Sequence, residues 1–454
     1  MEPKANKVAM ELVNPHAAGI DVGSRSHWVA VGQHPEDIKE FGVFNQDLLN
    51  LANWLGEKQI KTVAMESTGT YWQSLYSVLI QKGFQVILCN GKFTKNIKGR
   101  KTDVQDCQWI QKLHSIGLLT GSFLPDEHTE HLRTYCRHRT NLVDMAADTQ
   151  KKMQKYLRLL NLRLDVVVND TCGVTGLTII EAICGGETKP EKLAALRHGN
   201  CRKSEAEIAL ALQTNGRKDY LFALQQELDM YKTLQEKIKA CDNEIKIFIE
   251  QTIEENEDKK QHHVDAKPYK KINKNTPRNI DLNLTGYQYF EGVDLLTIEG
   301  FSHNTLLTLM SEVGPDGIKK FPSAKHFASW LRLSPNNKIS GGKVLSNKLP
   351  KGSNRLKIAL RNAANSIGNL KAASPLADFF KRINYRKGRG AAISATARKL
   401  SVIIWNMVVK NMPYVNPEGY LYEYQKRKIK AAQRIKKQIK NFGLNAVDLG
   451  ISIV

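Results

Sequence analysis

Short apolar runs, each ended by glycine, serine or charged residues, fill the first part of the chain. Residues 17–21, 27–31, 61–66 and 84–88 follow this pattern, which predicts four strands. Residues 71–81 instead carry apolar side chains at spacings of three and four, which predicts an amphipathic helix before the last strand. Strand, turn, helix and strand at this spacing are typical of an α/β unit with a largely parallel sheet.

Four carboxylates follow these elements. Asp21 and Glu66 each stand at the carboxyl end of a predicted strand, where open α/β sheets place their ligand sites. Asp103 and Asp106 lie on one face of a helix that begins near Thr102. Carboxylates that converge at one sheet edge repel each other unless a cation lies among them, and Mg²⁺ prefers such oxygen ligands. The alternative is that the two later acids only favour the first turn of a helix.

The rest of the chain is patterned mainly for helices. Residues 127–165 form one long basic helix, and apolar positions between 221 and 248 recur at spacings of three and four. That spacing predicts the seam of a two-chain coiled coil over roughly four heptads, and one helix lying on its own domain is the alternative. Residues 254–283 are polar and charged, so we expect an exposed linker. A second compact region begins at residue 286, with helices over 355–373 and 394–412.

Composition narrows the function. The 454 residues, of which 41% are hydrophobic, are enough for two or three domains with cores. The net charge of +22 indicates a polyanionic partner, nucleic acid first, although a merely soluble basic protein is the alternative. Seven scattered cysteines without metal-ligand spacing indicate reduced thiols in a cytoplasmic protein rather than structural zinc. No run of about 18 apolar residues is found, so no membrane span is expected.

The segments that carry the four acids resemble a known family. GIDVGS, AMESTGTYW and GRKTDVQDCQW are similar to the RuvC-like (RNase H-fold) domain of the DEDD transposases, the IS110 family of insertion sequences that includes the Piv-type DNA invertases. The resemblance implies metal-ligand roles for Asp21, Glu66, Asp103 and Asp106, with Mg²⁺ as the cofactor. The implied fold class is α/β plus all-α: a RuvC-like domain, a helical coiled-coil middle and a mostly helical C-terminal transposase domain.

A second resemblance lies in the C-terminal half. Ser340, Gly341 and Gly342 follow a Leu-x-Pro segment and precede a Lys-Gly segment that leads into a helix. This order is similar to the family's transposase domain, in which a serine of a Ser-Gly motif is the nucleophile, so Ser340 inherits that role. Ser346 and Ser353 are weaker candidates. Judged without the resemblance, a serine before two glycines indicates only a turn.

Candidate nucleic-acid contacts are the cations near these motifs. They lie before the acids of the third segment, on the long basic helix, around the serine and in a glycine-containing basic loop ahead of the last helix. A solvated surface is the alternative for the long helix and for the basic tail, 425–440. The candidates are Arg100, Lys101, Arg133, Arg137, Arg139, Lys343, Lys348, Lys351, Arg355, Arg386, Lys387 and Arg389.

The resemblance also implies a reaction and partners. Members of the family form a covalent 5′-phosphoserine link to DNA, assemble as tetramers built of two dimers, and use a bridge RNA from their own element to choose donor and target DNA. The chain is therefore expected to be an RNA-guided DNA recombinase, dimerised through its coiled coil. The expected domains are 1–165 (RuvC-like, with the basic helix), 166–258 (helical, with the coiled coil), 259–285 (linker), 286–420 (serine-containing) and 421–454 (basic tail).

Three other functions stay open at this stage. A RuvC-like nuclease would hydrolyse DNA with a metal and never rejoin it, with the serine region only binding DNA. An actin-like ATPase or sugar kinase shares the GIDVGS opening, but the second phosphate loop and adenosine motif that it needs are not found in the sequence. An architectural nucleic-acid binder would explain the charge and leave the four placed carboxylates unexplained.

Overall fold

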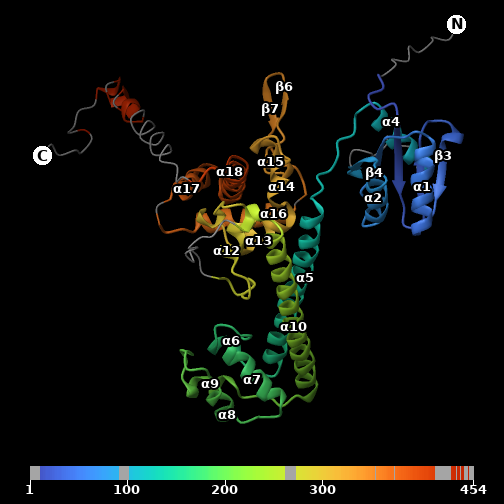
Figure 1. Ribbon diagram of the computed structural model, residues 1–454. Coiled ribbons are helices and arrows are strands. Elements are labelled where there is room, and N and C mark those ends of the chain that lie inside the picture. The colour runs from blue at the N-terminus through green and yellow to red at the C-terminus, as the bar shows by residue number, and fades with distance from the viewer. Residues whose placement is uncertain are drawn as a thin grey trace, which may run out of the picture. The chain divides into compact units, whose positions relative to one another are not determined.

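The computed structural model divides into two compact units, residues 1–124 and 125–454 (Figure 1). Each unit is described by itself below. The long basic helix that we expected in the first domain belongs by its packing to the second unit. The structure describes residues 11–91, 102–260, 272–352, 354–372, 374–414, 431–435, 437–439, 441–443 and 448.

The first unit contains one five-stranded sheet in the order β3-β2-β1-β4-β5. The central strand β1 pairs in parallel with β4, which pairs in parallel with β5, while β2 and β3 are antiparallel. The sheet is therefore mixed rather than largely parallel, and it is compatible with the expected RNase H-like domain. The strands are β1 (Ala17–Val22), β2 (His27–Ala30), β3 (Ile38–Phe41), β4 (Thr62–Glu66) and β5 (Gln85–Cys89).

Side chains alternate between the two faces of this sheet because the side-chain period of a strand is two residues. Ile20 and Met65 point into a core with α1 (Asn45–Glu57) and α2 (Trp72–Gln81). Ala64 and Cys89 point to the opposite face, into a separate core with α4 (Asp103–Ser115). Strand β3, helix α1 and the short 3₁₀ turn η1 (Pro35–Asp37) were not predicted from the sequence.

Helix α4 runs antiparallel to β1 across that second face. The Gln111 side chain donates to the carbonyl of Ala17 over 3.3 Å, and His114 bonds the hydroxyl of Thr62, the residue paired with Ala17. The C-terminal part of α4 thus lies at the beginning of β1, and its first turn lies at the carboxyl end of β1. The helix begins where expected, because Thr102 caps it by accepting from the amide of Gln105.

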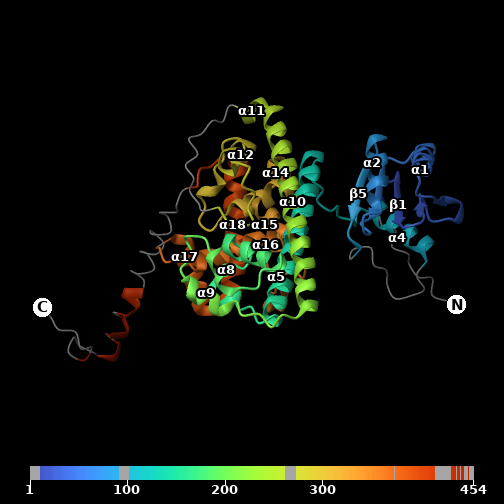
Figure 2. The same ribbon diagram turned by 90° about the horizontal axis from the view of Figure 1, so that it is seen from below.

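Two long antiparallel helices, α5 (Glu127–Leu159) and α10 (Lys218–Glu254), form the spine of the second unit (Figures 1 and 2). Leu224 and Leu228 of α10 are buried in one core with Met153 of α5. The apolar stripe over 221–248, expected as a two-chain seam, is therefore covered within the chain. The spacing of apolar residues predicts that another helix packs against the stripe, but it does not show whether that helix belongs to the same chain or to a second copy.

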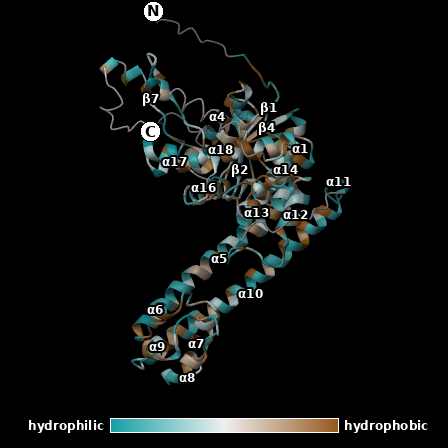
Figure 3. Ribbon diagram, turned by 90° about the vertical axis from the view of Figure 1, so that its left-hand side faces the viewer, coloured by the Kyte–Doolittle hydropathy of each residue, from teal (hydrophilic) through white to brown (hydrophobic). Residues whose placement is uncertain are grey.

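Four short helices close the end of the spine where α5 leaves and α10 begins (Figure 3). Buried isoleucines and leucines of these helices extend the core between α5 and α10. They are α6 (Leu164–Val167), α7 (Val174–Cys184), α8 (Pro190–Ala195) and α9 (Glu205–Ala211).

A bundle of helices packs at the other end of the spine. Its central helix, α18, is long and apolar enough to cross a membrane by length and composition alone, but half of its apolar stretch is buried in the bundle, as in a core helix of a globular unit. The elements are α11 (Glu257–Lys260), α12 (Leu282–Tyr289), η2 (Leu295–Thr297), α13 (His303–Glu312), α14 (Gly314–Lys319), α15 (Ala324–Trp330), α16 (Arg355–Gly368), α17 (Pro375–Lys387) and α18 (Arg389–Lys410).

Part of the expected linker is not an exposed connection. Thr276, Pro277 and Ile280 are buried, and Asn279 donates to Asn243 of α10. Residues 261–271 of that linker, and 425–430 of the expected basic tail, lie outside the described residues. The described tail residues 431–435 and 437–439 are helical.

Candidate functional site

The first candidate site, which we call the carboxylate edge, is formed by Asp21, Glu66, Asp103 and Asp106. The parallel register of β1 and β4 pairs Ile20 with Met65, so the next step along both strands brings Asp21 beside Glu66. Paired residues of neighbouring strands point to the same face. That face is the one covered by α4.

Helix α4 brings a third acid to the same place. A Cβ on Gly19 would lie 2.1 Å from the amide nitrogen of Gln111 and 2.6 Å from the carbonyl oxygen of Cys107, so only glycine lets the helix backbone lie directly on the strand. Asp103 precedes Cys107 by four helical residues, and Asp21 follows Gly19 by two strand residues. Four helical residues and two strand residues each span about 6 Å. Because α4 runs antiparallel to β1, both steps lead toward the carboxyl end of β1. The backbones of Asp103 and Asp21 are therefore level, at the carboxyl end of β1.

The acids also affect the pKa values of two buried thiols, Cys107 and Cys89. Burial raises the pKa of Cys107 to about 12, and the carboxylates of Asp21 and Asp106 add to the increase. Burial likewise raises the pKa of Cys89 to about 11, with a further contribution from Glu66. Both thiols therefore stay protonated at neutral pH and do not offer a thiolate ligand.

Carboxylate oxygens are suitable ligands for Mg²⁺, which binds one or two carboxylates and fills its other coordination positions with water and phosphate oxygens. Asp21, Glu66 and Asp106 are half-buried, and Asp103 is exposed. Within the described ranges, no three His, Cys, Asp or Glu side chains lie close enough together to form a ligand group for a metal. The backbones of Asp21, Glu66 and Asp103 lie at the same end of the sheet, and the ligand roles of the four acids stay a prediction.

The second candidate site is a β-hairpin in the second unit, which we call the serine hairpin. Strand β6 (Lys338–Ser340) pairs with β7 (Lys343–Ser346), and Ser340 is directly opposite Lys343. The turn consists of Gly341 and Gly342 with φ of +53° and +75°, which are the two left-handed positions of a type I′ turn. The glycine pair is therefore required by the backbone. The sequence indicated a turn here and did not reveal the strands.

The serine hairpin projects from the helical bundle between α15 and α16 (Figure 1). Every residue from 335 to 345 is exposed, including Ser340. The hairpin is held only at its root. There Asn336 bonds the carbonyl of Lys348 over 3.1 Å, Arg332 donates to the carbonyl of Lys351, and Lys357 donates to the carbonyl of Gly352.

The surroundings of the hairpin are strongly positive. Residues 317–377 contain twelve lysines and arginines and no aspartate or glutamate. Lys357 is buried at the root, and its pKa is lowered by that burial and by the guanidinium groups of Arg361 and Arg332. Sequence reasoning missed these three root residues as a positive cluster, although the lack of acids in this stretch could have revealed it.

The candidate arginines of α5 are ion-paired within the second unit. Arg139 is buried and forms a double ion pair with Asp242 of α10. Arg137 bonds both carboxylate oxygens of Glu312 in α13, over 2.9 and 2.7 Å, and Arg133 donates to the Glu312 carbonyl. These ion pairs join α5 to its neighbours within the second unit, and the expected phosphate contacts of the three arginines stay a prediction.

The remaining basic candidates divide by place. Lys343, Lys348 and Lys351 lie on the hairpin or its root, and none of them is ion-paired within the part of the chain that the structure describes. The expected basic loop is in fact the end of α17 and the start of α18, separated by Gly388. There Arg386 and Lys387 are exposed, and Arg389 donates to Asn365 and Asn369. Arg100 and Lys101 lie outside the described residues.

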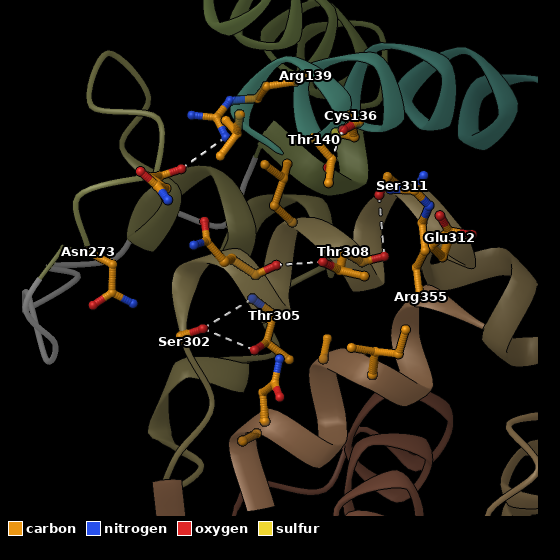
Figure 4. A pocket seen from close by; sticks show the side chains of 18 of the residues that line it. Cys136, Arg139, Thr140, Asn273, Ser302, Thr305, Thr308, Ser311, Glu312 and Arg355 are labelled. Carbon is orange, nitrogen blue, oxygen red and sulfur yellow. Dashed lines mark hydrogen bonds between the residues drawn. The ribbon is translucent and has the colours of Figure 1, made fainter. Parts of the chain in front are cut away.

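A polar cavity of about 830 Å³ lies between α5, α13 and α16 (Figure 4). Arg355, in the first turn of α16, is among its lining residues. Its hydroxyl groups are already used within α13, where Ser302 accepts from the amide of Thr305 and Thr308 donates to the carbonyl of Asn304. These hydroxyl groups are therefore already hydrogen-bonded within the chain.

Comparison with known families gave two matches. A family model described as a DEDD transposase of IS110 matches residues 18–161, and a second, described as a transposase of the IS116/IS110/IS902 family, matches residues 294–377. The first match contains the carboxylate edge and the second contains the serine hairpin. Curated proteins gave no match. With the two matches in this order over half of its length, the chain belongs to the IS110 family of insertion-sequence transposases.

Proposed function

We propose that this transposase cuts and rejoins DNA through a covalent bond between Ser340 and a DNA 5′ phosphate. The observation that carries the proposal is the serine hairpin: an exposed hydroxyl on a projecting turn, directly opposite Lys343, in a stretch of chain without acids. A DNA backbone reaches such a hydroxyl without any rearrangement of the bundle.

The reaction balances without an outside reactant. Ser340 Oγ loses its proton and bonds the phosphorus, the bond from phosphorus to the 3′ oxygen breaks, and that oxygen gains a proton. In the rejoining step a 3′ hydroxyl of the exchanged strand attacks the phosphoserine, and Oγ regains its proton. The ammonium group of Lys343 stabilises the negative charge of the pentavalent phosphate in both steps.

The carboxylate edge is proposed to hold the cofactor. Asp21, Glu66, Asp103 and Asp106 would bind Mg²⁺, which supplies positive charge to the phosphate oxygens when it is bound. The support is the shared face of β1 and β4 and the direct packing of α4 at Gly19. The described residues next to Ser340 include no histidine, so a carboxylate is the natural proton acceptor.

The proposed partners are donor and target DNA, a bridge RNA from the same element, and further copies of the chain in the cytoplasm. The net charge of +22 supports polyanionic partners. In the proposed tetramer the acids of one subunit act with Ser340 of another. Because the stripe of α10 is covered within the chain, subunits would meet through another surface.

The test is a trapped adduct. The substrate is a duplex of the element's end and its flank, nicked beside the cleavage site so that the short 3′-hydroxyl fragment is lost, and it is supplied with the element's non-coding RNA. We expect a protein–DNA band on a denaturing gel for the parent chain and for Ser346→Ala, a change on the same hairpin, and none for Ser340→Ala. An adduct that persists in Ser340→Ala would show that another residue is the nucleophile.

The same substrate separates the transposase from the hydrolytic alternative. A nuclease would release free 5′-phosphate ends with Mg²⁺, form no adduct and leave Ser340→Ala as active as the parent. A recombinase would instead yield joined products when the intact duplexes are used.

A further inference from the structure

The serine hairpin has a second face that the proposed chemistry does not use. Ser340 and Lys343 form one cross-strand pair, and the next pair is Ile339 with Val344, so these two side chains lie on the opposite face of the ribbon. Ile339 is 61% exposed and Val344 is 60% exposed. Leu345 follows at a register shift in β7 and is 69% exposed.

Three large aliphatic side chains on a two-stranded ribbon in solvent need an explanation. All residues from 335 to 345 are exposed, so the helical bundle leaves these three side chains largely in solvent. Most of the surface of these side chains is not buried by folding, and threonine would serve the strands equally well. The positive charge around these side chains favours a polyanionic partner such as DNA. Lys338, Lys343 and Lys348 flank the apolar face, and residues 317–377 include no aspartate or glutamate.

We propose that Ile339 and Val344, with Leu345, form a wedge that enters the DNA duplex and unstacks the base step next to the phosphate that Ser340 attacks. A two-stranded ribbon is narrow enough to enter a DNA groove, and aliphatic side chains inserted between base pairs are a known means of opening a step. The lysines hold the flanking phosphates, and the wedge contacts the bases.

The two faces of the ribbon make the wedge and the serine act together. A one-residue step along β6 leads from Ile339 to Ser340, so insertion of one face brings the other to the backbone of the same step. An unstacked step also lets the exchanged strand turn toward its new partner. Ile339 and Val344 are thus positioning residues for the reaction, and this inference rests on the proposed function of the hairpin.

The experiment places 2-aminopurine, whose fluorescence rises on unstacking, on either side of the cleaved phosphate in the element's duplex. It uses the full chain with Ser340→Ala and the element's RNA, so covalent chemistry cannot contribute to the signal. We expect binding to raise the fluorescence about twofold or more, as in other proteins that unstack a base step. The double variant Ile339→Thr/Val344→Thr should keep the fluorescence of the free duplex.

Two controls make the result specific. Leu210→Thr removes an equally exposed leucine from α9, far along the spine from the hairpin, and should leave the rise unchanged. DNA affinity of the double variant should stay within about threefold of the parent, because phosphate contacts supply most of the binding. A loss of binding as large as the loss of fluorescence would mean a general docking surface and would overturn the wedge.

The other possible outcomes also test the wedge. An unchanged fluorescence in the bound parent overturns the wedge, even if Ser340 proves to form the adduct. A rise that persists while no Ser340 adduct is found overturns the nucleophile and keeps the wedge. Light scattering measures the mass of the DNA-free protein. If the double variant has a lower mass than the parent, and DNA binding by the parent does not raise the fluorescence, the apolar face is covered by a second copy of the chain. The proposal is then wrong.

Discussion

The carboxylate edge and the serine hairpin are built in opposite ways. The acids of the first unit are placed by packing: the register of β1 with β4 fixes two of them, and the contact of α4 with Gly19 levels a third. Ser340 is placed by turn chemistry: two left-handed glycines and a few bonds at the root hold an otherwise exposed ribbon.

The difference teaches where each half of the proposed centre is vulnerable. A packed site changes when the spacing between a helix and a strand changes by a fraction of an ångström, and the unit then loses stability as well. A projecting hairpin loses its function through its turn or its charge while the bundle stays folded.

The largest effect is expected for Gly19→Ala. The added Cβ would meet backbone atoms of α4 at 2.1 and 2.6 Å, so the helix must move away from the sheet and carry Asp103 away from Asp21. We expect a loss of about 1–3 kcal/mol or more in the free energy of unfolding, measured in urea, together with loss of DNA cleavage. Gly56→Ala at the end of α1, where nothing lies within 4 Å of the new Cβ, is the matched control and should be harmless. Equal stability of the two variants would contradict the packing of α4 described here.

The turn of the hairpin predicts a loss of function without unfolding. Gly341→Val forces a β-branched residue to φ of +53°, which it adopts only with strain, so the turn must rearrange and Ser340 must move. Adduct formation should fall by at least about tenfold, because a misplaced nucleophile loses its orientation. Gly341→Asn creates the Asn-Gly pair favoured in type I′ turns and should keep activity. A Val variant as active as the Asn variant would mean that this turn does not position the serine.

The lysines of the hairpin should set the salt dependence of DNA binding. Lys343→Ala/Lys348→Ala/Lys351→Ala should lower the slope of log affinity against log salt by about 0.9 per lysine, or roughly 2.7 in all. The unfolding midpoint should not change, because these side chains are at the surface of the hairpin and its root. The triple change Lys151→Ala/Lys152→Ala/Lys155→Ala removes the same charge from α5 and should alter the slope less. Equal slopes for the two triple variants would mean that the overall positive charge of the chain attracts DNA, with no special contribution from the hairpin lysines.

The smallest effect concerns Lys357 at the root. Burial and two neighbouring guanidinium groups hold its pKa below the ordinary 10.5, so the unfolded chain binds more protons than the folded chain between the two values. The free energy of unfolding should therefore rise with pH in that window. Lys357→Met should be more stable at neutral pH and should lose that part of the rise, as followed by urea unfolding between pH 7 and 10.5. Lys371→Met, exposed after α16, should keep the profile of the parent. A Lys357→Met variant with the parent's profile would contradict the electrostatic cost at the root.

Local patterns in the sequence predicted four of the five strands of the sheet and the long helices of the spine, but not α1 or most of the short helices of the second unit. The strands around Asp21 and Glu66, the helix that begins after Thr102 and the long helices of the spine lie where the periodicity indicated. The sheet is mixed because β2 and β3 pair in antiparallel fashion. Strand β3 was not predicted because it is short and half-polar, with the sequence IKEF. The hairpin around Ser340 was missed as a pair of strands for the same reason: each strand has three or four residues and no buried face.

The basic candidates show what a sequence cannot decide. Arg139 and Lys343 look alike as positive residues near a motif, but Asp242 lies 103 positions from Arg139 and becomes its ion-pair partner only in the fold. The stripe of α10 is a similar case, since its partner helix is in the same chain. The acids were easier to predict, because strand ends and helix starts are local features of the sequence.

The measurement that tests the central claim most directly is a peptide map of the trapped adduct. Trypsin cleaves after Lys338, Lys343 and Lys348, so residues 339–343 form one peptide whose only hydroxyl side chain is that of Ser340, and residues 344–348 form another that contains Ser346. After nuclease digestion of the DNA, mass spectrometry should find a nucleotide linked through its 5′ phosphate to peptide 339–343. A nucleotide on peptide 344–348 or elsewhere in the chain would contradict the account, and so would cleaved DNA with free 5′ phosphates and no modified peptide.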